Sequence, residues 1–457
     1  MPSVLIQTLG CKLNQLESEA FSDAFAKAGF SLYNPSNGTS PGIIIINTCT
    51  VTSKADQKAR RVIRKALRDY PNSAVLVTGC YAQLDYSKIC ELDSVSDERR
   101  LFALRGAEKE NILDLPRYLG EKKDIRGALK LLCGDGEQKA ESVERTAGKF
   151  QFNPEHFSEH TRGFLKIQDG CDKHCTYCRI RLARGQSVSL DAEQVLSRLR
   201  ILEENYSEAV LTGVNISQYR DDVRAFDLGE LLKFLLDGTS KINLRLSSLA
   251  PEIINERFAQ IMTNKRIRPH FHLSVQSGSE KILEKMGRGY NSETVEKAAV
   301  LLRRVKDDPF LACDIIAGFP GETKDEFEKT HNLCRKIGFA WIHVFPYSKR
   351  PATPAWSFTG AVHEAEVTER VQILTCLANQ GRAEYVKRWL GREVDVLIEK
   401  GAYGKSFCRG VSENYLKLLV QRDSKTTKPG TVLRCRICDD IMTDVHKEDH
   451  DAAAVCI

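Results

Sequence analysis

Three cysteines, Cys171, Cys175 and Cys178, limit the folds open to this chain more than any other part of its sequence. They directly follow Phe164–Gln168, an apolar run of strand length, so they lie on a loop at the end of a predicted strand. Zinc sites normally take four protein ligands. Three thiolates on one short loop suit three irons of an oxygen-sensitive [4Fe–4S] cluster and leave its fourth iron open. The alternative is a zinc knuckle with His174 as substitute ligand.

Strands and helices alternate from Phe164 to about Cys376. Such alternation over more than 200 residues predicts a parallel sheet, and six strand–helix units fit a full or partial (β/α)6 barrel similar to a TIM barrel. We place this domain, with its trailing helices, at residues 161–390. The predicted strands are Phe164–Gln168, Glu208–Thr212, Asn243–Ser247, His270–Val275, Phe310–Ile316 and Trp341–Phe345.

Residues 1–120 show the same alternation on a smaller scale and predict a Rossmann-like parallel α/β domain. A helix is expected over Glu17–Ala28, with Gly29 ending it. The predicted strands are Val4–Thr8, Ile43–Asn47 and Ala74–Thr78.

A second set of cysteines, Cys11, Cys49 and Cys80, follows these three strands, one cysteine after each. The carboxyl ends of parallel strands meet at one edge of a sheet, so the three thiols are expected to converge. Their convergence indicates a second iron–sulfur cluster. Three small, buried, free cysteines are the alternative.

The C-terminal pattern changes to short strands without helices between them, which predicts a small all-β barrel over residues 391–448. These strands are Val394–Glu399, Ser406–Val411, Tyr415–Gln421 and Thr431–Ile437. Residues 121–160 are expected to be a linker with an edge segment, and the polar tail from Asp444 onward, including 449–457, is expected to be frayed. We interpret Cys435 and Cys438 as structural.

Composition indicates a cytoplasmic protein. No basic segment precedes an apolar core at the N-terminus, and the apolar runs are far too short for a membrane span. Fifteen cysteines in a reducing compartment favour metal ligation or redox chemistry over structural disulfides. The net charge of +6 permits a nucleic-acid partner without requiring one. We expect a monomer, and no side chain is identified as a catalytic general base.

The three-cysteine loop and four later segments resemble the radical S-adenosylmethionine (SAM) superfamily. The segments are Leu211-Thr-Gly-Val-Asn215, Arg245-Leu-Ser-Ser-Leu249, His272-Leu-Ser-Val-Gln-Ser-Gly278 and Asp314-Ile-Ile-Ala-Gly-Phe-Pro-Gly-Glu-Thr323. The resemblance implies that SAM binds the open iron and that one electron cleaves it to a 5′-deoxyadenosyl radical. The SAM contacts that it implies are Tyr177, Thr212, Gly213, Asn215, Ser247, Gln276, Asp314 and Gly318.

Over nearly its whole length the chain resembles the methylthiotransferase family, because the three domains occur in that family's order. The resemblance implies two [4Fe–4S] clusters, one on Cys171, Cys175 and Cys178 that makes the radical, and one that carries the transferred sulfur. It assigns the second cluster to Cys11, Cys49 and Cys80. SAM is then both methyl donor and radical source, and an electron donor and a sulfur donor are further partners.

Three segments resemble the branch that acts on N6-threonylcarbamoyladenosine at position 37 of tRNA. They are Gly10-Cys-Lys-Leu-Asn-Gln-Leu-Glu-Ser18, Asn47-Thr-Cys-Thr-Val-Thr-Ser-Lys-Ala-Asp56 and Val344-Phe-Pro-Tyr-Ser-Lys-Arg-Pro-Ala-Thr-Pro-Ala355. The alternatives are isopentenyladenosine-37 of tRNA, an aspartate of a ribosomal protein, or a non-catalytic iron–sulfur protein that binds RNA or transfers electrons.

Basic residues add physical evidence for an RNA substrate. A stripe at helical spacing follows Cys49 and is suited to tRNA phosphates, although a stripe of this kind is as often merely a solvated helix face. Its members are Lys54, Lys58, Arg61, Lys65 and Arg68, with Arg60 and Arg64 beside them. Arg179, Arg181 and Arg184 are expected to crowd the cluster mouth and to contact phosphate or a substrate carboxylate. The C-terminal module resembles the RNA-binding TRAM domain.

Overall fold

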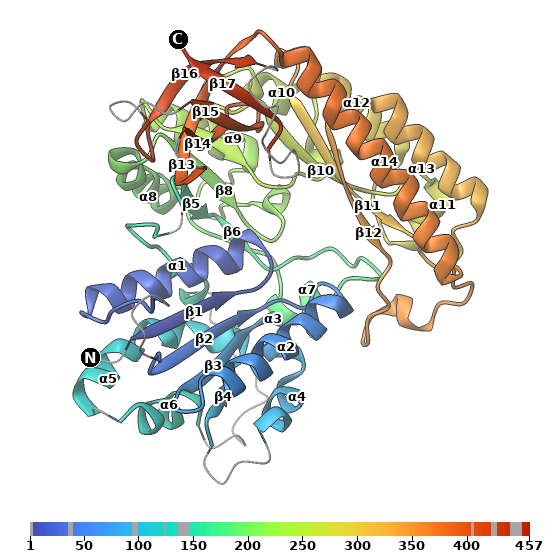
Figure 1. The fold of residues 1–457 in the computed structure, drawn as a ribbon. Helices are drawn as coiled ribbons and strands as arrows, with labels where there is room; N and C mark the ends of the chain where they lie inside the picture. Colours follow the sequence, from blue (N-terminus) through green and yellow to red (C-terminus); the bar gives the residue numbers. More distant parts are fainter. Residues whose placement is uncertain are drawn as a thin grey trace.

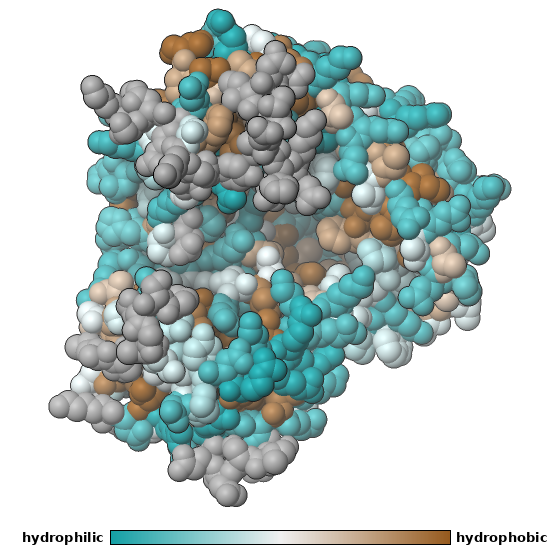
Figure 2. Space-filling view, viewed as in Figure 1, coloured by the Kyte–Doolittle hydropathy of each residue, from teal (hydrophilic) through white to brown (hydrophobic). Residues whose placement is uncertain are grey.

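Three units form the molecule in the computed structural model (Figure 1). The structure describes residues 3–34, 40–93, 99–122, 124–134, 147–158, 160–403, 406–421, 427–438 and 450–457. The N-terminal α/β domain lies at the lower left of the view, below the central barrel and the C-terminal β-barrel. A recess opens between the N-terminal domain and the two units above it (Figure 2).

The N-terminal domain is a parallel sheet with strand order β1-β2-β3-β4. Its strands are β1 (Val4–Thr8), β2 (Ile43–Thr48), β3 (Ala74–Gly79) and β4 (Leu101–Ala103). Leu32 adds a parallel bridge on the outer side of β1, so the chain first crosses away from β1 and then returns to the other side as β2. The strand order therefore reverses between β1 and β2, and the crevice at such a reversal is where open α/β sheets bind ligands.

Helices cover both faces of this sheet. One face packs on α1 (Lys12–Lys27), α5 (Leu115–Lys122) and α6 (Ile125–Cys133), and the other on α2 (Ser53–Asp69), α3 (Cys80–Leu84) and α4 (Tyr86–Cys90). The three predicted strands are confirmed to within one residue, but α1 begins five residues before the predicted start. Its first turns bury Asn14 and Glu17, polar residues that hide the helical hydrophobic period.

The predicted linker at 121–160 is partly wrong. Helix α6 lies inside it, and Ala128 and Leu129 are fully buried against the N-terminal core, as is Phe152 further along. The high charge of the surrounding sequence obscured this short amphipathic helix. Residues 135–146 of the predicted linker lie outside the described residues.

The central unit is the predicted partial barrel of six parallel strands. They are β5 (Gly163–Lys166), β8 (Glu208–Thr212), β9 (Asn243–Leu246), β10 (His270–Gln276), β11 (Phe310–Ala317) and β12 (Trp341–Pro346). They form two three-stranded sheets, which the parallel bridge between Leu249 and Leu273 joins. A short hairpin of β6 (Gln168–Asp169) and β7 (Val188–Ser189) carries the cysteine loop.

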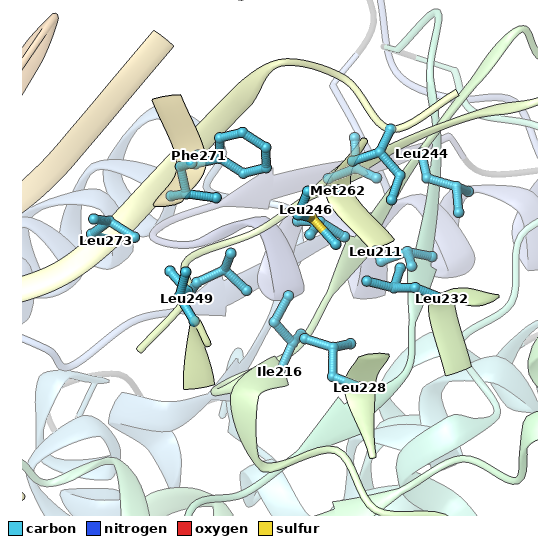
Figure 3. Packing of buried hydrophobic residues seen from close by; sticks show 14 of the residues in the cluster. Leu211, Ile216, Leu228, Leu232, Leu244, Leu246, Leu249, Met262, Phe271 and Leu273 are labelled. Carbon is cyan, nitrogen blue, oxygen red and sulfur yellow. The ribbon is translucent and has the colours of Figure 1, made fainter. Parts of the chain in front are cut away.

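Outer helices bury the apolar residues of these strands. They are α8 (Ala192–Asn205), α9 (Leu228–Gly238), α10 (Glu256–Met262), α11 (Glu280–Lys285), α12 (Ser292–Val305), α13 (Lys324–Ile337) and α14 (Glu364–Trp389). Figure 3 shows Leu211, Leu246 and Phe271 of the strands packed with Leu232 and Met262 of the helices. None of the helices in the described ranges is both long enough and apolar enough to span a membrane.

The C-terminal unit is a closed five-stranded barrel of order β13-β14-β15-β17-β16. Its strands are β13 (Glu393–Tyr403), β14 (Phe407–Ser412), β15 (Lys417–Gln421), β16 (Val432–Cys438) and β17 (Ala452–Cys456). The prediction of a frayed tail is wrong for β17, because this strand pairs with both β15 and β16 and closes the barrel. A run of three alanines carries little strand signal, and only its neighbours define it. Residues 444–449 lie outside the described residues.

A buried ion cluster fastens this barrel to the central unit. Glu208 accepts hydrogen bonds from Arg245 Nε at 2.7 Å and Arg268 Nε at 3.0 Å. Burial alone would raise the pKa of Glu208, but Arg245 and then Arg268 lower it to about 2. Arg245 Nη2 also donates to the Ser412 carbonyl at 3.4 Å, and its guanidinium lies 5.2 Å from the Tyr415 ring centre. The C-terminal barrel thus closes the end of the central barrel that is opposite the cysteine loop.

We predict that Glu208→Gln destabilises the protein by about 3–5 kcal/mol, because it leaves two buried arginines without their carboxylate. The expected result is a thermal midpoint lower by roughly 5–15 °C. Glu293→Gln is the matched control, since Glu293 pairs with Lys297 on an exposed helix face. Equal midpoints for the two variants would contradict this role of Glu208.

Candidate active site

The first cysteine loop follows β6 and is held in place by three hydrogen bonds from two of its residues. Cys171 N donates to the Gly185 carbonyl at 3.1 Å. Thr176 donates twice to the end of α11, from N to Met286 O at 3.0 Å and from Oγ1 to Lys285 O at 2.8 Å. All three cysteine side chains are half-buried. Burial raises the pKa of the Cys171 thiol, and it raises that of Cys178 to about 11.

The second set of cysteines lies at the carboxyl edge of the N-terminal sheet, as predicted. Cys11 precedes α1, Cys49 follows β2, and Cys80 begins α3, so Cys11 and Cys49 flank the crevice where the strand order reverses. Gly10 has a φ of +109°, and a Cβ there would lie 2.8 Å from Cys49 Sγ. Burial first of all, together with the adjacent Cys11 and Cys80, raises the pKa of Cys49 to about 12. Cys11 and Cys80 therefore lie close enough to Cys49 to affect its pKa.

The donor sets fit [4Fe–4S] clusters better than single ions. Within the described ranges, no three His, Cys, Asp or Glu side chains are arranged to hold one metal ion. A cubane does not require that arrangement, because each thiolate binds a different iron. Thiols with raised pKa values stay protonated in the free protein, so binding a cluster releases protons.

Arg184 connects the two cysteine sites. It ends α7 (Ile180–Arg184), the short helix directly after the first cysteine loop, and its side chain enters the N-terminal domain. Its Nε lies 3.4 Å from Cys80 Sγ. Its Nη1 donates to Glu17 Oε1 at 3.1 Å and to both Asp169 oxygens at 3.2 Å, and its Nη2 donates to Asn14 Oδ1 at 3.0 Å.

Two lysines complete this buried network. Lys109 Nζ lies 2.5 Å from Glu17 Oε1, and Lys166 pairs with Asp169. Although burial would raise the pKa of Glu17, the surrounding cations, first of all Arg184, lower it to about 2. Sequence reasoning missed the network because its members lie far apart in the chain. The one local signal was Lys166, a charged residue inside an apolar strand.

The prediction that three arginines crowd the cluster mouth is only partly right. Arg184 is buried as described above. Arg179 Nη1 forms a buried ion pair with Asp85 Oδ2 at 3.0 Å. Arg181 alone stays on the surface of the loop, where it contacts the His174 ring. Two of the three arginines therefore join domains.

Five of the predicted SAM contacts lie near the end of the strands that carries the cysteine loop. Thr212, Ser247 and Gln276 end or directly follow β8, β9 and β10, and Gly213 follows Thr212. Asn215 N donates to Gln168 Oε1 at 2.9 Å, and the Asn215 side chain forms a hydrogen bond with the Cys171 thiol. These positions share one rim of the barrel.

Two further predicted SAM contacts, Tyr177 and Gly318, lie at the same end of the barrel, whereas Asp314 lies further inside it. The Tyr177 ring lies 6.2 Å from that of Phe319, so the cysteine loop meets the turn at Gly318. Asp314 lies inside β11, and its Oδ1 is 3.0 Å from His272 Nε2. Its carboxylate is thus already paired within the barrel, a partner that sequence reasoning did not anticipate.

The family model described as "Radical SAM superfamily" matches residues 165–334, and that of "Uncharacterized protein family UPF0004" matches residues 3–98. A structure of the radical SAM methyltransferase TsrM from Kitasatospora setae matches with a TM-score of 0.52 and 15% identity, covering 78% of this chain and 75% of that one. Fold and site together define a radical SAM enzyme.

Two curated relatives are named threonylcarbamoyladenosine tRNA methylthiotransferase MtaB. The Treponema pallidum protein is 37% identical and is matched over 96% of this chain and 98% of its own length. The Thermotoga maritima protein is 34% identical over 91% of each chain. This chain therefore belongs to the MtaB-type family of radical SAM methylthiotransferases. Its cofactors are SAM and [4Fe–4S] clusters.

Proposed function

We propose that this enzyme converts N6-threonylcarbamoyladenosine at position 37 of tRNA to its 2-methylthio derivative. The names of its relatives support this substrate. The observation that carries the proposal is the pair of three-cysteine sites joined through Arg184, which lies six residues after Cys178 and contacts Cys80. Adenine C2–H has no acidic proton and no leaving group, so a radical is suited to remove its hydrogen.

In this proposal, Cys171, Cys175 and Cys178 hold the radical-generating cluster. The second cluster, on the N-terminal set, carries the sulfur, with Cys11, Cys49 and Cys80 as its ligands. When bound, the clusters and SAM supply the radical, the sulfur and the methyl group. The side chains around them orient the thiolates and keep water from the reacting groups. An electron donor and a sulfur donor complete the reaction, and we propose that the enzyme works as a monomer in the cytoplasm.

The basic stripe on α2 is the proposed phosphate contact. Lys54, Lys58, Arg61, Arg64, Lys65 and Arg68 are all exposed. They give the hydrophilic surface seen over α2 in Figure 2. The helix begins four residues after Cys49, so RNA phosphates along it would lie beside the N-terminal cysteine site.

We predict that the triple variant Lys58→Ala, Arg61→Ala, Lys65→Ala weakens tRNA binding and flattens its salt dependence. Loss of three phosphate contacts reduces the slope of log K against log salt by about two to three. Fluorescence anisotropy over a salt series measures this slope. The control variant Lys297→Ala, Arg304→Ala, Lys336→Ala removes three exposed cations from the outer helices α12 and α13. An equal change in both variants would contradict a specific role of the stripe.

Mass analysis of tRNA nucleosides from cells with and without the gene tests the proposed function. We expect the 2-methylthio derivative of threonylcarbamoyladenosine to disappear without the gene and to return with the wild-type copy. Retention of this nucleoside with loss of the methylthio form of isopentenyladenosine would move the substrate to that nucleoside. If the tRNA nucleosides were the same with and without the gene, and a ribosomal aspartate were unmodified without it, the substrate would be a ribosomal protein.

A further inference from the structure

A cavity of about 400 Å³ lies between the N-terminal domain and the central barrel. We call it the interdomain pocket. Its walls come from α2, from α3 and α4, and from the loop after β12. Tyr81 and Arg179 also line it, and these are the residues directly after Cys80 and Cys178. The pocket thus lies beside both proposed cluster sites.

Five cationic side chains and two carboxylates line the interdomain pocket. Asp85 pairs with Arg179 at 3.0 Å and with Lys88 at 2.6 Å. Asp56 pairs with Arg350 at 2.8 Å. Both carboxylates are therefore neutralised by fixed partners, and the pocket keeps an excess of positive charge.

The two remaining cations, Arg60 and Lys349, form no ion pair with a carboxylate in the part of the chain that the structure describes. Arg60 Nη1 donates to the Tyr81 hydroxyl at 2.9 Å, which orients the guanidinium at the pocket wall. Lys349 Nζ lies 4.9 Å from the ring centre of Trp356. Trp356 is 47% exposed, whereas tryptophan is on average a highly buried residue.

We propose that the interdomain pocket receives a nucleotide that neighbours the modified adenosine in the RNA substrate. The base stacks on Trp356, and Arg60 and Lys349 bind a phosphate. This inference rests on the proposed RNA substrate and adds to it a place where the enzyme holds the anticodon loop. Proteins that bind single-stranded RNA combine an aromatic platform with a positively charged groove in this way.

The features of the pocket favour a nucleotide over other occupants. Its volume falls within the range of small-ligand sites. A protein partner would need to bury about 800 Å² of the surface on this side. The charges without a carboxylate partner are only two side chains, and both line one concave site. SAM carries a sulfonium cation, and the positive excess of the pocket disfavours it.

The test uses the full-length enzyme with both clusters reconstituted and a synthetic anticodon stem–loop that carries N6-threonylcarbamoyladenosine. Anisotropy measures binding over a salt series. We expect Trp356→Ala to weaken binding about tenfold, because it removes base stacking, and Trp356→Phe to restore most of the affinity. We expect Lys349→Ala to reduce the salt slope by about one. Lys297→Ala is the control, and equal iron content and thermal midpoints show that the variants are folded.

A second measurement locates the nucleotide. With 5-iodouridine beside the modified adenosine, irradiation should crosslink the RNA to Trp356, the exposed aromatic residue of the pocket. The inference is overturned if both pocket variants bind like the wild type and the crosslink forms elsewhere. It is also overturned if the variants slow cluster reduction by an acidic electron-transfer protein without changing RNA binding. Wild-type enzyme that neither binds nor modifies the stem–loop would refute the proposed function instead.

Discussion

Replacing Cys80 with alanine is expected to abolish methylthiolation while leaving reductive cleavage of SAM. Cys80 lies in the N-terminal domain, and the first cysteine loop takes no ligand from that domain in our assignment. The variant should therefore lose one cluster of two, and iron should fall from about eight to about four atoms per chain. Anaerobic assays of 5′-deoxyadenosine and of the modified nucleoside, with iron analysis, measure the three quantities together.

Cys175→Ala is the matched partner of this variant. It removes a ligand from the other site, so both SAM cleavage and methylthiolation should be lost, with the same loss of iron. Cys376→Ala serves as the control, because Cys376 is exposed on α14. If Cys80→Ala retained full methylthiolation, the N-terminal cysteines would not carry the sulfur.

Arg184→Leu is expected to destabilise the protein and to lower the reduction potential of the N-terminal cluster. Arg184 is buried and serves Cys80, Glu17 and Asp169 at once, so its loss leaves carboxylates short of a cation. Breaking such a network costs about 3–5 kcal/mol, which corresponds to a fall in the thermal midpoint of roughly 5–15 °C. Because hydrogen bonds and positive charge near cluster sulfurs raise the reduction potential, the N-terminal cluster should also become harder to reduce.

Two variants separate the network from a general effect on α7. Arg184→Lys keeps the charge but loses the forked geometry, and should fall between wild type and Arg184→Leu. Arg181→Leu changes the same short helix but removes only a contact with His174. A redox titration followed by electron paramagnetic resonance reads the potential. If Arg184→Leu changed neither the reduction potential of the N-terminal cluster nor the thermal midpoint of the protein, the coupling of the two sites would be refuted.

The fold could be predicted wherever apolar periodicity was strong. Runs such as Ile43–Ile46 are buried on both faces of a parallel sheet and leave little doubt about the strand. Elements whose stability comes from distant partners escaped prediction. The strand β17 is defined by β15 and β16, and the first two turns of α1 are defined by buried polar contacts of Asn14 and Glu17.

The cysteine positions could be predicted because each one directly follows a strand. The contacts between the two cysteine sites could not. The sequence predicted that Arg184 contacts phosphate or a substrate carboxylate, because spacing in the sequence reveals neither its burial nor its contact with Cys80. The ligand roles of the six cysteines and of the SAM contacts remain predictions, and the Cys80 and Cys175 variants test one ligand of each proposed cluster.

An anaerobic reaction of the purified, reconstituted enzyme with SAM, a reductant and tRNA that carries N6-threonylcarbamoyladenosine tests the proposed conversion itself. Nucleoside mass spectrometry with methyl-labelled SAM follows the product. We expect one hydrogen of the adenine to be replaced by a methylthio group carrying the labelled methyl, with formation of 5′-deoxyadenosine. SAM cleavage with the threonylcarbamoyl nucleoside left unmodified would contradict it.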